Sequence, residues 1–97
     1  MSEVIEVVRF QLAAHVSPQD FLVLDQAVER EHVAKQPGFL RRESASAPGG
    51  EWLVIVHWAS TADADASMAA FPSAPAAADF MKNLDAKSMT MQRFSRH

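Results

Sequence analysis

The pair His57-Trp58 is the first place in this sequence where side chains could do chemistry. It ends the stretch 51–58, in which residues 53–56 are all apolar, as is typical of a central β-strand covered on both faces. A neutral imidazole at His57 could accept a proton from a phenol or an enol, whereas the structural interpretation is a strand histidine that hydrogen-bonds a neighbour. Trp58 could line a ligand cavity or belong to the core. Because side chains alternate along a strand, the two rings share one pocket only if a bulge intervenes.

Two charged side chains, Glu6 and Arg9, interrupt the stretch 4–12, which is rich in β-branched and aromatic residues and predicts another strand. Alternation places them on opposite faces of this strand. Glu6 could be a base in an apolar pocket, but a position in water at the rim of the sheet is favoured, since it lies near the start of the chain. Arg9 could bind a substrate carboxylate, but a structural ion pair, for example with an acid across a dimer, is favoured.

Several large, flexible apolar side chains could form the wall of a ligand pocket, although the hydrophobic core is the simpler interpretation for most of them. These residues are Phe71, Phe80, Met81, Met89 and Met91. Metal binding is not supported, since the four histidines are scattered and form none of the spacings typical of metal sites. The sequence contains no cysteine and no tyrosine, which excludes thiolate chemistry and any mechanism that needs a tyrosyl hydroxyl.

Length and composition limit the class of protein further. The 97 residues predict one domain, residues 1–97. The formal net charge of −3 and the lack of a basic cluster argue against a nucleic-acid partner. No apolar run approaches the ~20 residues that span a membrane, and the first residues, Met-Ser-Glu-Val-Ile-Glu, lack the features of a signal peptide. A cytoplasmic protein is therefore the default expectation.

Capping and turn residues divide the chain into alternating strands and helices. The expected elements are a strand at 4–12, a helix from Ser17 to about Gln36, strands at 39–47 and 51–58, a helix at about 61–71 broken by Pro72, a further helical segment whose apolar stripe reaches Leu84, and a last strand at 88–94. In the first helix, the spacing of apolar residues predicts an inner face with Phe21 and Val28 and places Asp25 on the outer side.

This order of elements predicts an α+β fold of the ferredoxin-like βαββαβ type, with a four-stranded antiparallel sheet. The most apolar strands, 4–12 and 51–58, take the two central positions in that topology. Helices cover only one face of such a sheet, and the other face still carries large apolar side chains. A homodimer in which two sheets pack face to face would cover it.

The same stretches resemble the antibiotic biosynthesis monooxygenase-like family of dimeric α/β barrels. The resemblance spans nearly the whole chain and rests on Glu6-Val7-Val8-Arg9-Phe10, Gln36-Pro37-Gly38-Phe39-Leu40, Glu51-Trp52-Leu53 with Val56-His57-Trp58, and the segment 84–91. It implies a small-molecule site between the sheet and the helices, and no cofactor. Haem breakdown, which occurs in this superfamily, is disfavoured. The positions that match the iron-binding histidine, the tryptophan and the asparagine of the haem-degrading relatives hold Phe80, Ala70 and Val8.

The function that this resemblance implies is a cofactor-independent monooxygenase acting on a small aromatic, quinol-like or enolic substrate. His57 would be the base that makes the substrate anion, which passes an electron to oxygen in a dry pocket. The expected substrate-binding residues are Trp58, Arg9, Glu6, Phe71, Phe80 and Met91. The alternative is a non-catalytic dimeric α/β barrel that binds a small apolar or aromatic ligand or serves as an interaction module. An isomerase or a lactone-opening enzyme would use a similar pocket without consuming oxygen.

Overall fold

The computed structural model describes residues 2–97, and its strands and helices follow the order that the sequence predicts. The elements are β1 (Val4–Leu12), α1 (Pro18–Glu31), β2 (Phe39–Ser46), β3 (Glu51–Trp58), α2 (Thr61–Ala70), α3 (Pro75–Lys82) and β4 (Leu84–Ser95). Two short 3₁₀ turns, Val33–Lys35 after α1 and Phe71–Ser73 after α2, complete the chain.

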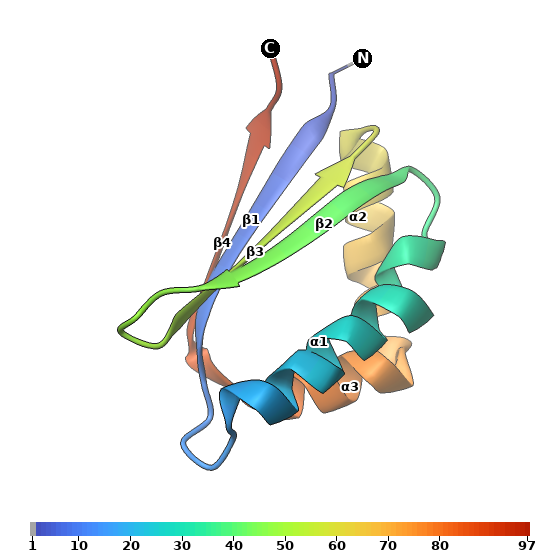
Figure 1. Ribbon diagram of the computed structural model, residues 1–97. Coiled ribbons are helices and arrows are strands. Elements are labelled where there is room, and N and C mark those ends of the chain that lie inside the picture. Colours follow the sequence, from blue (N-terminus) through green and yellow to red (C-terminus); the bar gives the residue numbers. More distant parts are fainter. Residues whose placement is uncertain (1) are drawn as a thin grey trace.

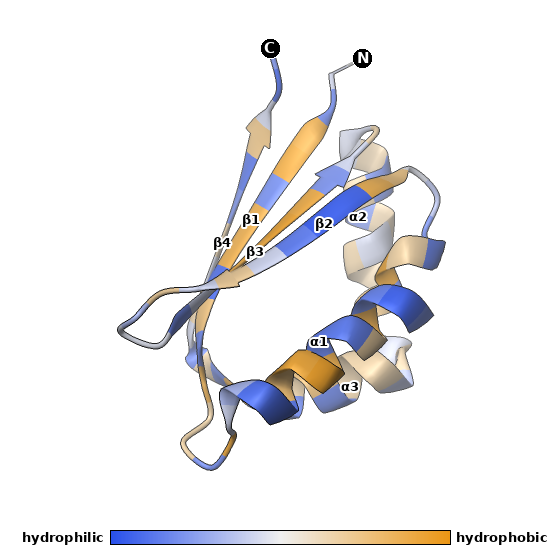
Figure 2. Ribbon diagram, viewed as in Figure 1, coloured by the Kyte–Doolittle hydropathy of each residue, from blue (hydrophilic) through white to orange (hydrophobic). Residues whose placement is uncertain are grey.

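The four strands form one antiparallel sheet in the order β2-β3-β1-β4, so the two strands predicted to be central are central. All three helices lie on the same side of this sheet (Figure 1). The hydrophobic residues concentrate on β1 and β3, whereas β2 at the edge is largely hydrophilic (Figure 2). This is the ferredoxin-like α+β fold, with one face of the sheet under helices and the other bare.

Two serines fix where the first two helices begin. The Oγ of Ser17 accepts the backbone N–H of Asp20, and the Oγ of Ser60 accepts that of Asp63, each over 3.1 Å. Helix α1 ends at Glu31, earlier than Gln36, because the chain tightens into a 3₁₀ turn before Pro37. Between residues 2 and 97, no helix is both long enough and apolar enough to cross a membrane.

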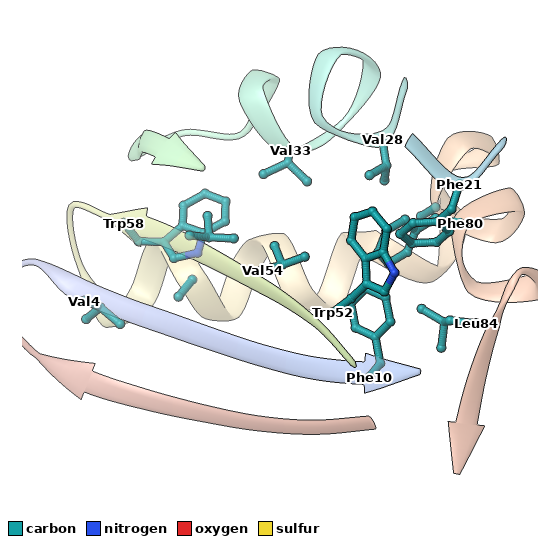
Figure 3. Close-up of a cluster of buried hydrophobic side chains, with 13 residues drawn as sticks. Val4, Phe10, Phe21, Val28, Val33, Trp52, Val54, Trp58, Phe80 and Leu84 are labelled. Atoms are coloured by element: carbon teal, nitrogen blue, oxygen red, sulfur yellow. The ribbon is translucent and has the colours of Figure 1, made fainter. Parts of the chain in front are cut away.

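The core between sheet and helices centres on a cluster of aromatic rings. Phe21 of α1 is fully buried, and its ring centroid lies 5.6 Å from that of Phe10, 5.0 Å from that of Trp52 and 5.2 Å from that of Phe80. Figure 3 shows these four rings gathered at one end of the sheet and Trp58 at the other, with Val54 between them. The aromatic cluster therefore joins α1 and α3 to β1 and β3 at one end only.

The last strand differs from the sequence-based expectation. It begins at Leu84, which was expected to end a helical stripe, and it contains a bulge in place of the expected break at 85–87. Gln11 pairs with Asp85 whereas Arg9 pairs with Thr90, so the intervening residues of β4 lie outside the regular ladder. The Oγ of Ser88 accepts the Gln11 N–H over 2.8 Å, which replaces the missing ladder bond.

Candidate functional site

The pairing of the strands decides which side chains can share a site. Val4, Glu6, Val8 and Phe10 of β1 lie on the face that the helices cover, here called the inner face. The cross-strand partners of Glu6 and Val8 on β3 are Val56 and Val54, and Trp58 follows on the same face. Ile5, Val7 and Arg9 lie on the opposite, outer face, as does His57, the partner of Ile5.

A cavity of about 310 Å³ lies between the inner face and the helices. Its walls come from all four strands and from the segments 67–72 and 80–81, so it lies on the side of the sheet that the family resemblance predicted. The lining is mostly apolar and consists of Val8, Phe10, Val33, Val54, Val56, Trp58, Met68, Phe71, Pro72, Phe80, Met81, Met89 and Met91, with Glu6, Arg42 and Ser67 as its polar members. An apolar cavity of this size with few polar groups is the usual form of a small-molecule site.

Glu6 is the carboxylate in the wall of the cavity, and it is only 8% exposed. The expectation that it lies in water at the rim of the sheet is therefore wrong. Arg93 of β4 offsets the cost of burying this charge, because its Nε donates to the Glu6 Oε2 over 3.1 Å. Arg93 also donates to Asp65 of α2, and these hydrogen bonds, first to Asp65 and then to Glu6, raise the pKa of the guanidinium above its ordinary value.

A second ion pair at the cavity joins α1 to β2. Arg42 Nη2 lies 2.8 Å from the Oδ1 of Asp25, and their side chains are 4% and 6% exposed. The Oγ of Ser44 donates to the other Asp25 oxygen over 2.7 Å, and Arg42 Nη1 lies 3.4 Å from Glu29. The expectation that Asp25 lies on the outer side of its helix is wrong, because a guanidinium from the sheet compensates its charge.

Four of the expected substrate-binding residues besides Glu6 line this cavity: Trp58, Phe71, Phe80 and Met91. Trp58 is buried, and its indole N–H has no hydrogen-bond partner within residues 2–97. Its ring packs edge-on against Phe39, with centroids 6.0 Å apart, and this contact holds it at the end of the cavity. Met81 and Met89, expected as wall or core, also line the cavity. Their flexible thioethers suit a ligand wall.

His57 and Arg9 do not reach this cavity. His57 is buried on the outer face, with its Nδ1 3.6 Å from Glu3 and its Nε2 3.5 Å from Glu43. No bulge moves it to the side of Trp58, since both residues keep regular pairing with β1. Arg9 lines a groove on the outer face and forms no ion pair with any residue from 2 to 97.

Three polar residues at the cavity were not expected from the sequence: Arg42, Ser67 and Arg93, the last of which holds Glu6 without lining the wall itself. For Arg42 a signal existed, because Arg41 and Arg42 are neighbours on a strand and one of them must face inwards. Ser67 and Arg93 give no such signal, since Ser67 lines the cavity and Arg93 meets Glu6 only in the folded chain. Across the described chain, no three His, Asp or Glu side chains gather closely enough to hold a metal ion.

No family model matches the sequence, and no curated protein matches it either. The fold, however, matches solved structures over nearly its whole length. SnoaB, a cofactor-independent oxygenase from Streptomyces nogalater, superposes with a TM-score of 0.82 at 20% identity, covering 100% of this chain and 95% of that one. A dimeric ferredoxin-like protein of unknown function from Thermobifida fusca gives 0.75 at 14% identity, covering 98% and 92%. A candidate antibiotic biosynthesis monooxygenase from Chloroflexus aurantiacus gives 0.67 at 16% identity, covering 99% and 94%.

At these identities the likeness concerns the fold. The ferredoxin-like architecture predicted from the sequence is confirmed, and the resemblance to the monooxygenase-like dimeric α/β barrels holds at the level of the fold. A shared fold does not determine the chemistry, which depends on the side chains that line the cavity.

Proposed function

We propose that the protein is a cofactor-independent monooxygenase that binds a small aromatic substrate with a phenolic or enolic hydroxyl in the cavity between sheet and helices. The observation that carries this proposal is that a mostly apolar cavity of about 310 Å³ contains one buried carboxylate, Glu6, in its wall. One Glu6 oxygen is held by Arg93, and the other forms no hydrogen bond within residues 2–97, so it can accept one from a ligand. A cofactor-independent oxygenase, SnoaB, shares the fold.

Glu6 takes the place of His57 as the proton acceptor in this proposal, because Glu6 lines the cavity and His57 lies on the other face of the sheet. The substrate hydroxyl donates to Glu6, and its proton moves to the carboxylate as an electron passes from the ring to oxygen. The ring radical and superoxide combine to a peroxide at a ring carbon that carries hydrogen, and this peroxide takes the proton back from Glu6. The outer peroxide oxygen then leaves as water with that proton and the hydrogen of the same carbon, and a carbonyl remains. Trp58, Phe71 and Phe80 keep water from these intermediates.

The test is oxygen consumption with isotope tracing. Purified protein is supplied with 1-naphthol or 1,8-dihydroxynaphthalene and ¹⁸O₂, and uptake is followed at an oxygen electrode above the protein-free rate. We expect one labelled oxygen atom in each product molecule and the other in water. Hydrogen peroxide with an unlabelled product would mean an oxidase. Binding without oxygen consumption would favour the non-catalytic binding protein.

The assembly that completes this proposal is a homodimer formed through the outer face. Val7, Leu53, Ile55 and Phe94 line the groove on this face, and Phe94 is strongly exposed. A second copy packed sheet to sheet would cover these side chains. The relative from Thermobifida fusca is dimeric, and it has the same fold.

An aspartate at Val7 is expected to separate the two copies. In the dimer its charge would be buried in the centre of an apolar interface without a partner, which should weaken association at least ~100-fold. Val23→Asp is the matched control, since Val23 is 66% exposed on α1, away from the sheet. Light scattering during gel filtration should give a dimer for the natural protein and the control and a monomer for Val7→Asp. A monomeric natural protein would contradict the proposed dimer.

A further inference from the structure

The charges around the cavity are unequal in number. Arg42 is paired with Asp25 at 2.8 Å and with Glu29 at 3.4 Å. Arg93 is paired with Glu6 at 3.1 Å and with Asp65. Each guanidinium thus already faces two carboxylates, and neither has charge left to compensate an anion that enters the cavity.

Arg9, on the central strand β1, cannot supply the missing positive charge. Arg9 is exposed and unpaired among the described residues, but it points to the outer face, with the whole sheet between it and the cavity. A ligand in the cavity therefore meets Glu6 as its nearest group of full charge that is free to interact. Because the lining is apolar, repulsion between Glu6 and a ligand carboxylate would be only weakly screened.

From this arrangement we infer that the cavity selects against anions, and that its ligand presents a neutral hydrogen-bond donor to Glu6. This inference rests on the proposed ligand site but not on turnover. The cavity would take hydroxylated aromatic compounds and reject carboxylated compounds with the same ring system. In any reaction sequence, a carboxylate on this part of the substrate would have to be removed or masked before this protein acts.

The test compares 1-naphthol with 1-naphthoate, which share their rings and differ in charge at pH 7. Isothermal titration calorimetry on the natural protein should show binding of 1-naphthol that is at least ~30-fold tighter than that of 1-naphthoate. Equal or tighter binding of 1-naphthoate would overturn the inference, whatever the oxygenase assay shows. Failure of both compounds to bind would overturn the inference together with the proposed ligand site.

Two variants locate the source of this selectivity. Glu6→Gln removes the charge in the wall and should reduce the preference for 1-naphthol to about threefold or less. Asp65→Asn removes one of the two carboxylates that face Arg93, at an exposed residue that does not line the cavity, so the risk to folding is small. Because Arg93 then keeps only Glu6 as a charged partner, this variant should bind 1-naphthoate severalfold more tightly. Glu31→Gln, an equal charge change on the exposed side of α1, is the control and should leave the preference unchanged. An unchanged preference in both cavity-side variants would contradict the inference.

Discussion

Replacement of Arg42 by methionine is expected to lower the free energy of unfolding by about 3–5 kcal/mol, because it leaves Asp25 charged and buried without its partner. The two side chains are 4% and 6% exposed and lie 2.8 Å apart. They join α1 to β2, so their loss should loosen the helix that covers one wall of the cavity. A domain of this size is stable by only about 5–15 kcal/mol, and the loss is a large part of that. Urea denaturation followed by tryptophan fluorescence measures it.

Two further variants show whether the ion pair is the cause. Arg30→Met breaks only the exposed pair with Glu31, whose side chains are 70% and 55% exposed, and should change stability by no more than about 0.5 kcal/mol. Arg42→Met combined with Asp25→Leu removes both charges and should recover most of the lost stability. If Arg42→Met alone unfolds at the same urea concentration as the natural protein, the pair does not hold α1 to the sheet.

Glu6→Gln is expected to lower kcat by at least ~100-fold in the oxygenase assay, since the amide has the shape of the acid but cannot take a proton. The fold should persist, because Arg93 keeps its hydrogen bond to Asp65. Glu51→Gln, the same change on an exposed outer-face position opposite Gln11, serves as the matched control and should keep full turnover.

The same assay separates the two candidate bases. His57→Gln changes the residue that the sequence suggested, which lies near Glu3 and Glu43 on the outer face. If His57→Gln abolishes turnover in an intact dimer while Glu6→Gln retains it, the assignment of Glu6 is wrong and chemistry takes place on the outer face.

Local signals were enough to predict the fold. Ser17 and Ser60 cap the first two helices, which begin where the sequence predicted them, and the apolar stretches 4–12 and 51–58 became the central strands. A helix cap depends on residues that are neighbours in the sequence, and a central strand is recognised by apolar side chains on both of its faces. A single sequence shows both of these patterns.

The parts that could not be predicted depend on contacts between distant residues. Asp25 looked solvent-facing because its partner, Arg42, lies 17 positions away on another element. The bulge in β4 depends on a hydrogen bond between Ser88 and the backbone of Gln11, 77 positions apart. Such a pairing leaves no pattern in the local sequence, so neither the buried acid nor the early start of β4 was foreseen.

For the candidate cavity, the sequence pointed to part of the apolar lining and to Glu6, but not to Arg42, Ser67 or Arg93. Trp58, Phe71, Phe80 and Met91 were expected to line a cavity, and they do. The alternation of side chains along the strand also predicted correctly that His57 and Trp58 lie on opposite faces, but it could not predict which face the helices cover. Which face is covered follows from the packing of the helices against the sheet. For this reason Glu6, and not His57, is the proton acceptor in the proposed function.

The central claim is that ligands bind between the sheet and the helices, and methyl NMR tests it most directly. Met68, Met81 and Met89 line the cavity, whereas Ile5 and Ile55 lie on the outer face. During titration with 1-naphthol, we expect the labelled methyl groups of these three methionines to shift and saturate together, while those of the two isoleucines stay unchanged. Shifts confined to Ile5 and Ile55 would place the ligand on the outer face and contradict the claim.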